Sequence, residues 1–233
     1  MSDIILECKN LKKSYGPKQA LKGIDLALEK GKIVGLLGPN GSGKTTFIKI
    51  CAGLLRQTEG SITIDSKNIG TETKAIVSYL PERTYFESSM RVVDAIKFFK
   101  TFYLDFDEVR AYDMLKKLDI DVNMRFKKMS KGTKEKVQLI MVMSRRAKIY
   151  FLDEPIAGVD PAARDYIINT IINNYDENAA IVISTHLISD IENILDDVIF
   201  IKNGEIVIDE NVDEIREKSG KSIDSLFREV FKC

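Results

Sequence analysis

The stretch Gly38-Pro-Asn-Gly-Ser-Gly-Lys-Thr45 decides the fold, because it has the form G-x-x-x-x-G-K-T and is followed directly by Thr46. The apolar run 32–37 before it is typical of a buried strand, and residues 46–55 after it have apolar side chains at helical spacing. A glycine-rich loop between a strand and a helix is the context in which this motif binds phosphate. We therefore predict a phosphate loop here rather than a simple glycine turn before a helix.

The residue types in this loop suit the phosphates of a nucleotide. Glycines let the backbone approach an anion, and the N–H groups of the loop and of the helix start point at it. Lys44 would reach the β- and γ-phosphates, and Thr45 would bind Mg²⁺. The residues expected to bind nucleotide are Gly38, Pro39, Asn40, Gly41, Ser42, Gly43, Lys44, Thr45 and Thr46.

The composition of the 233 residues excludes several classes of protein. Lys plus Arg and Asp plus Glu both number 35, and without a long basic block we expect no nucleic-acid partner. Three scattered cysteines form neither a disulfide framework nor a zinc pattern, which fits a reducing cytoplasm. The N-terminus lacks the features of a signal peptide, and no apolar run approaches the roughly 20 residues that span a bilayer. We expect a soluble chain that can still sit on a membrane protein.

Strands and helices divide the chain into regions of different character. The apolar runs 148–153 and 179–184 are typical of parallel strands buried on both faces, and Asp160-Pro161 is typical of a helix start. Between the phosphate loop and the run 148–153, residues 83–147 have apolar side chains at helical spacing, with Asp107 and Ser130 as helix-capping residues. Further strands are expected at 4–8, 24–28, 60–65 and 75–80, a hairpin at 198–208, and a helical tail at about 211–233. The expected fold is α/β: a P-loop core with a mostly parallel sheet, an antiparallel β subdomain and a helical subdomain inserted at 83–147.

Polar side chains follow both apolar runs. Asp153 and Glu154 end the first run, where an acid can hold the Mg²⁺ of a phosphate loop and its neighbour can polarise an attacking water. His186, the only histidine, follows the second. Since ligand sites form at the carboxyl ends of parallel strands, we expect all three side chains to lie in the site rather than to serve only as structural residues.

These motifs, together with Ala157-Gly-Val-Asp160, resemble in order and spacing the nucleotide-binding subunit of ABC transporters, over nearly the whole chain. The resemblance implies that the chain is an ATPase with ATP and Mg²⁺ as cofactors. The roles that it implies are adenine stacking for Tyr15, Mg²⁺ association for Asp153, general base for Glu154, γ-phosphate contact for His186, and contact with the partner subunit for the loop at Asp160.

Met129-Ser-Lys-Gly-Thr133 resembles the L-S-G-G-Q signature of the same family, with Lys131 and Thr133 as departures. The resemblance implies that Ser130 and Gly132 contact the γ-phosphate of an ATP bound to another subunit. Two copies, or this chain and a homologous subunit, would then form a head-to-tail dimer around two ATP molecules.

Glu82 stands where most members of the family have glutamine near Mg²⁺ and the attacking water. Its carboxylate could bind the metal more strongly, or repel the γ-phosphate when Mg²⁺ is absent. We therefore count Glu82 among the catalytic and metal-binding residues. This variant and the S-K-G signature resemble the ABC-2 type exporters, although drift at tolerant sites would also produce them.

The stretch 82–90 corresponds to the groove that receives a helix of the membrane subunit in this family. Its apolar residues Tyr85, Phe86 and Met90 suit such a contact, and they would equally suit the subdomain's own core. Phe227 and Phe231 are expected to pack on their own domain.

The resulting hypothesis is an ATPase on the cytoplasmic face of the cell membrane, attached as a peripheral subunit to a separate permease that acts in export. A soluble ABC-type ATPase without a role in transport is the first alternative. A P-loop kinase or nucleotide-binding regulator is the second, but it would need neither Ser130–Gly132 nor His186.

Overall fold

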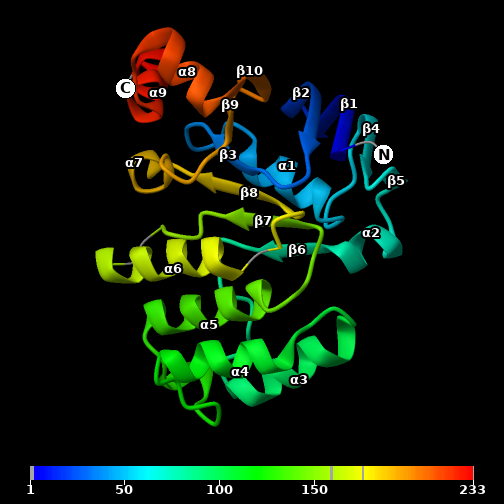
Figure 1. Cartoon of the computed structure of the whole chain (residues 1–233). Helices are drawn as coiled ribbons and strands as arrows, with labels where there is room; N and C mark the ends of the chain where they lie inside the picture. Colours follow the sequence, from blue (N-terminus) through cyan, green and yellow to red (C-terminus); the bar gives the residue numbers. More distant parts are fainter. Residues whose placement is uncertain (1–2, 158–159, 175, 233) are drawn as a thin grey trace.

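The computed structural model describes residues 3–157, 160–174 and 176–232 and contains two sheets (Figure 1). The antiparallel sheet has the order β2-β1-β4-β5, formed by β1 (Ile4–Tyr15), β2 (Lys18–Glu29), β4 (Glu59–Ile64) and β5 (Lys67–Asn68). The central sheet has the order β10-β9-β3-β8-β7-β6, formed by β3 (Ile33–Leu37), β6 (Val77–Leu80), β7 (Ile149–Asp153), β8 (Ala180–Thr185), β9 (Asp197–Lys202) and β10 (Glu205–Asn211). The mixed α/β fold with an antiparallel β subdomain is therefore confirmed.

The central sheet is parallel except for β10, which pairs with β9 in the expected hairpin. Every residue of β3, β7 and β8 is buried, as the continuous apolar runs predict. Because β3 lies between β8 and β9, the phosphate loop that follows it leaves the middle of the sheet.

Helices lie on both sides of this sheet. Their bounds are α1 (Lys44–Cys51), α2 (Thr71–Ile76), α3 (Val92–Phe102), α4 (Glu108–Lys117), the 3₁₀-helix η1 (Phe126–Lys128), α5 (Lys131–Met143), α6 (Pro161–Asn174), α7 (Ile188–Ile191), α8 (Val212–Ser219) and α9 (Ile223–Phe231). The helical insertion, α3 to α5, lies between β6 and β7 in the chain and below the sheet in Figure 1. The expected caps are present: Asp107 accepts a hydrogen bond from the N–H of Arg110, and Ser130 from that of Thr133.

The side chains of the central sheet alternate between two cores. On β7, Ile149 and Phe151 belong to the core shared with α1 and the antiparallel sheet, while Tyr150 and Leu152 belong to the core shared with the helical insertion and α6. Phe200 of β9 contacts the rings of Phe227 and Phe231, which therefore pack on their own domain as expected. The central sheet thus lies between two apolar layers, and the phosphate loop follows its strand β3.

Several predicted element bounds are wrong. The apolar run 75–80 is not one strand, because Ala75 and Ile76 complete α2, in which the Thr73 hydroxyl bonds back to Gly70. The helix predicted at 46–55 begins at Lys44 and ends at Cys51, since Gly53 takes a positive φ of 68° that ends it. Strands β1 and β2 extend well beyond 4–8 and 24–28, and the helical tail is broken at Gly220. The domain limits 83–147 and 211–233 stay predictions.

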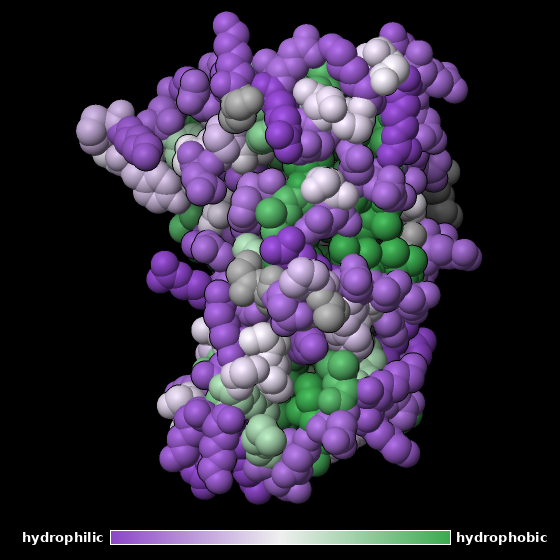
Figure 2. Space-filling model, turned by 90° about the vertical axis from the view of Figure 1, so that its left-hand side faces the viewer, coloured by the Kyte–Doolittle hydropathy of each residue, from purple (hydrophilic) through white to green (hydrophobic). Residues whose placement is uncertain are grey.

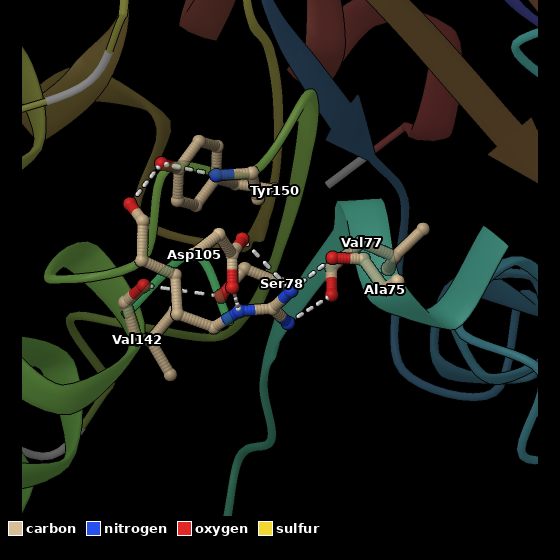
Figure 3. Close-up of polar contacts among 8 residues, drawn as sticks. Ala75, Val77, Ser78, Asp105, Val142 and Tyr150 are labelled. Atoms are coloured by element: carbon tan, nitrogen blue, oxygen red, sulfur yellow. Dashed lines mark hydrogen bonds and ion pairs between the residues drawn. The ribbon is translucent and has the colours of Figure 1, made fainter. Parts of the chain in front are cut away.

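A buried arginine joins the helical insertion to the edge of the central sheet. Its partners Asp105, Val77 and Ala75 are labelled in Figure 3. The side chain of Arg145 is only 2% exposed and forms two 3.0 Å hydrogen bonds with the Asp105 carboxylate. Its remaining donors bond the backbone oxygens of Val77 and Ala75, and its guanidinium lies 3.9 Å from the centre of the Tyr103 ring. Every nitrogen of the guanidinium is therefore hydrogen-bonded inside the protein.

The outer surface is largely polar. On the face shown in Figure 2, hydrophilic side chains predominate, and hydrophobic ones gather in separate areas at mid-height and over the helical insertion below. Within the described ranges, every helix is too short or too polar to cross a bilayer.

Candidate nucleotide-binding site

A cleft of about 430 Å³ opens above the phosphate loop, at the carboxyl ends of the parallel strands. Its wall combines the antiparallel sheet, the start of α1, the end of β6 and the loops after β7 and β8. Ten of the residues expected in the site line it: Tyr15, Asn40, Gly41, Gly43, Lys44, Thr45, Thr46, Glu82, Glu154 and His186.

The loop needs glycine at two positions for different reasons. Gly43, the residue before α1, has a φ of 118°, and a Cβ there would lie 2.9 Å from the backbone oxygen of Ala20. At Gly38 a Cβ would lie 2.3 Å from the backbone oxygen of Ile201. Any side chain would therefore force the loop away from the neighbouring strands, and the amide groups would no longer converge on one anion.

Lys44 folds back over its own loop. Its Nζ donates to the backbone oxygens of Gly38 at 2.7 Å and Pro39 at 3.4 Å. Burial lowers the pKa of this ammonium, while the nearby carboxylates of Glu154, Asp153 and Glu82 act in the opposite direction. The chain's own oxygens thus hold the cation beside the cleft, ready for exchange with phosphate oxygens.

Asp153 and Thr45 provide oxygen atoms suited to a magnesium ion. The Thr45 hydroxyl lies 3.3 Å from Asp153 Oδ1, which also accepts a 2.6 Å bond from the Ser184 hydroxyl. The other oxygen, Oδ2, is buried and has no hydrogen-bond partner among the described residues. Mg²⁺ is generally bound through one or two carboxylates together with substrate phosphates, so this carboxylate and hydroxyl fit the ion. Among those same residues, no group of three His, Cys, Asp or Glu forms a metal cluster.

Glu154 is held in an uncommon backbone conformation, with a φ of 52°. Its N–H donates to the backbone oxygen of Ser184 at 2.9 Å and to the Ser184 hydroxyl at 3.1 Å. Its carboxylate accepts a 2.9 Å contact from Nδ1 of His186. Such a conformation persists only where neighbours over-determine it, and the two bonds to Ser184 hold the Glu154 backbone in place.

The remaining predicted residues lie outside the wall of the cleft. Gly38, Pro39, Ser42 and Asp153 do not line the cleft, but three of them contact residues that do. Gly38 and Pro39 accept hydrogen bonds from Lys44, and Asp153 accepts one from Thr45. Ser130 and Gly132 lie at the start of α5 and do not line this cleft. Asp160 is described, but Gly158 and Val159 of the same motif lie outside the described residues.

Sequence reasoning missed Lys18 and Ala20, which also line the cleft, and it named Ala157 only as part of a motif and not as a site residue. Lys18 comes directly after the turn that follows Tyr15. This nearness in sequence to an expected site residue was the only sign in the sequence that Lys18 lies in the site. Ser184 was predicted only as the end of the apolar run 179–184, although its hydroxyl contacts both Asp153 and the Glu154 backbone.

Known proteins resemble the chain over nearly its whole length. Residues 21–157 match the protein family described as ABC transporter. The Bacillus subtilis (strain 168) "Uncharacterized ABC transporter ATP-binding protein YdbJ" is 33% identical over 231 residues, covering 94% of this chain and 74% of that protein. The "Lantibiotic transport ATP-binding protein SrtF" of Streptococcus pyogenes is 30% identical over 211 residues, covering 90% and 92%. A solved "Structure of ATP binding subunit of ABC transporter" superposes with a TM-score of 0.88 at 27% identity, covering 97% and 99%.

Proposed function

The chain belongs to the ABC transporter family and is an ATPase of that family, and from this premise we propose that it powers a separate integral membrane permease. The observation that carries the proposal is the convergence of Lys44, Thr45, Glu154 and His186 on one cleft. The chain would bind the cytoplasmic face of the membrane as a peripheral subunit. Export is supported by the Glu82 and S-K-G variants and by the name of the lantibiotic transport relative.

Hydrolysis in this site rests on two oriented side chains. Glu154 would accept a proton from the attacking water, and His186, bonded to the same carboxylate, would contact the γ-phosphate. Lys44 would bind the β- and γ-phosphates. Thr45 and Asp153 would hold Mg²⁺, which would supply positive charge to offset the negative charge of the phosphates. Glu82 lines the same cleft, so its carboxylate can act on the metal or on the phosphate.

A second subunit would complete this half-site. Ser130 is exposed at the start of α5, and its hydroxyl caps the helix by accepting from Thr133 N–H. The positive end of a helix favours an anion, which supports contact with the γ-phosphate on the other subunit. We propose a head-to-tail dimer in which each ATP lies between one phosphate loop and the other chain's Ser130 and Gly132.

The permease would dock in a groove of about 460 Å³ between the sheet and the helical insertion. Tyr85 and Phe98 line it and are each nearly half exposed, whereas Phe86 stacks on Phe126 inside the insertion. The stretch 82–90 therefore divides between the two roles considered above, since Tyr85 suits a partner and Phe86 its own core. An apolar groove of this kind suits a short amphipathic helix.

Membrane association tests this assignment. We expect the tagged chain, isolated from membranes of its own host, to carry a stoichiometric integral membrane protein. Phe98→Asp should reduce the recovered partner by at least about 10-fold, because it puts a charge at the centre of an apolar contact. Phe102→Asp is the matched control, since Phe102 lies one turn further along α3 and is 66% exposed, outside the groove. Isolation without any integral membrane protein would favour the soluble alternative.

Adenine stacking on Tyr15 predicts a second effect. Tyr15→Ala should weaken ATP binding by about 10-fold, within the roughly 1–3 kcal/mol that one aromatic–base stack contributes. Tyr15→Phe keeps the ring and should bind ATP as the unmodified protein does. Equilibrium titration with a fluorescent ATP analogue measures both, and equal affinities for the Ala and Phe variants would contradict the stacking role.

A further inference from the structure

Helix α5 and Arg145, two residues beyond its end, are hydrogen-bonded to the segment 75–81 at three successive levels. Gln138 Nε2 donates to the backbone oxygen of Pro81 at 3.1 Å, and the Ser78 hydroxyl donates to the backbone oxygen of Val142 at 3.0 Å. At the third level, Arg145 bonds the backbone oxygens of Val77 and Ala75. Figure 3 labels Ser78 and Val142 of the second level and Val77 and Ala75 of the third. The helix and the strand run in opposite directions, and we call this set of bonds the α5–β6 ladder.

The first level of the ladder lies immediately before Glu82. Gln138 is only 3% exposed and sits in an otherwise apolar stretch of α5. Burying an amide is unfavourable unless it is hydrogen-bonded, and the bond to Pro81 is the one that the amide makes among the described residues. The backbone of Pro81 is therefore tied to α5 one residue before the carboxylate that lines the cleft.

The same place in α5 also faces the catalytic carboxylates. A small cavity of about 20 Å³ is lined by Gln138 and Glu135 from α5, by Pro81 and Glu82, and by Glu154. Glu135 and Gln138 are three residues apart and so lie on one face of the helix. This face of α5 therefore packs against the loop that carries Glu82 and against the side of the site that carries Glu154.

We propose that Gln138 is a positioning residue that couples the position of Glu82 to that of α5. The proposal rests on the proposed function, in which Ser130 at the start of α5 contacts the ATP of the other subunit. A shift of α5 when that ATP binds is then passed through Gln138 to the backbone of Pro81 and moves Glu82 relative to its own nucleotide. The two half-sites of the dimer are thereby linked through one helix.

The decisive variant is Gln138→Leu, which keeps the side-chain volume and removes the donor to Pro81. Without nucleotide, hydrogen–deuterium exchange of the backbone amides of residues 82–84 should become about 2- to 10-fold faster, the ratio that one net hydrogen bond supplies. The Mg²⁺ concentration that half-saturates tight ATP binding should rise by a similar factor. The ATP affinity at saturating Mg²⁺ should not change.

Two controls separate positioning from general loosening. Ser144→Ala removes another buried hydroxyl at the end of α5, one that faces Met114 rather than β6, and should change neither readout. In a Glu82→Ala background, Gln138→Leu should shift the Mg²⁺ dependence no further, because the residue acts through Glu82. Gln138→Met repeats the test with an unbranched side chain in case the leucine variant misfolds.

Unchanged hydrogen–deuterium exchange at residues 82–84 would overturn the proposal. So would a double variant in which the Gln138 and Glu82 substitutions shift the Mg²⁺ dependence independently of each other. Failure of the unmodified chain to bind ATP would instead contradict the proposed function. The exchange measurement without nucleotide is unaffected by that second outcome, so the two failures are distinguishable.

Discussion

Replacing Glu154 with Gln will lower the rate of ATP hydrolysis by roughly 10²–10⁴-fold, the usual contribution of a positioned general base. The amide keeps the shape of the carboxylate but cannot accept a proton from water. ATP binding should persist, because Lys44 and the loop amides are unchanged. The ATP that is not hydrolysed should keep the dimer closed. Phosphate release, nucleotide titration and size-exclusion chromatography with ATP measure the three effects.

The matched control is Glu210→Gln, which removes an exposed carboxylate on β10, remote from the cleft. It should hydrolyse ATP at the unmodified rate. Hydrolysis by the Glu154 variant at that same rate would refute the assignment of Glu154 as base. Loss of ATP binding would show that its carboxylate also contributes to binding ATP before hydrolysis.

Replacing Arg145 with Met will destabilise the protein by roughly 3–5 kcal/mol, the loss typical when one partner of a buried ion pair is removed. The methionine keeps much of the packing against Tyr103. It leaves the Asp105 carboxylate and the backbone oxygens of Val77 and Ala75 without their donor. Urea denaturation, with the free energy of unfolding as readout, measures the change.

The neighbouring residue offers the control. Arg146 also pairs with an aspartate, Asp107 at 2.9 Å, but its side chain is 74% exposed. Arg146→Met should therefore change stability by less than about 1 kcal/mol. Arg145→Lys should fall between the two, since an ammonium cannot reproduce the fork of a guanidinium. Equal losses for the two methionine variants would contradict the role given to Arg145.

Sequence reasoning succeeded where one local pattern determined the structure. The runs 148–153 and 179–184 could be assigned as buried parallel strands because little but a two-sided core accommodates such continuous apolar stretches. It failed at 75–80, where a short apolar run is compatible with both helix and strand. There the chain changes from α2 to β6 at Val77. This edge strand is bonded to α5 through Ser78 and to the residues just after α5 through Arg145. Because these contacts involve residues almost 70 positions away, the local sequence pattern does not reveal them.

The site divides in the same way. Lys44, Thr45, Asp153 and Glu154 belong to motifs whose spacing is fixed by strand ends, so they could be named in advance. Gln138 could not, because a polar residue in a helix usually faces solvent, and its partner is a backbone oxygen 57 residues earlier in the chain. Lys18 likewise enters the cleft only because β2 folds back beside the phosphate loop.

The position of β3 in the central sheet has a consequence for biosynthesis. Its two neighbours, β8 and β9, are made of residues 180–185 and 197–202, whereas β3 itself ends at residue 37. While the ribosome is still adding the intervening segment, the strand that leads into the phosphate loop has no partner on either edge. Ordering such distant pairings is slow, and an unpaired apolar strand is prone to association. The nascent chain therefore acquires a formed nucleotide cleft only when most of it has been synthesised, and the antiparallel sheet of β1, β2, β4 and β5 is the part that can assemble first.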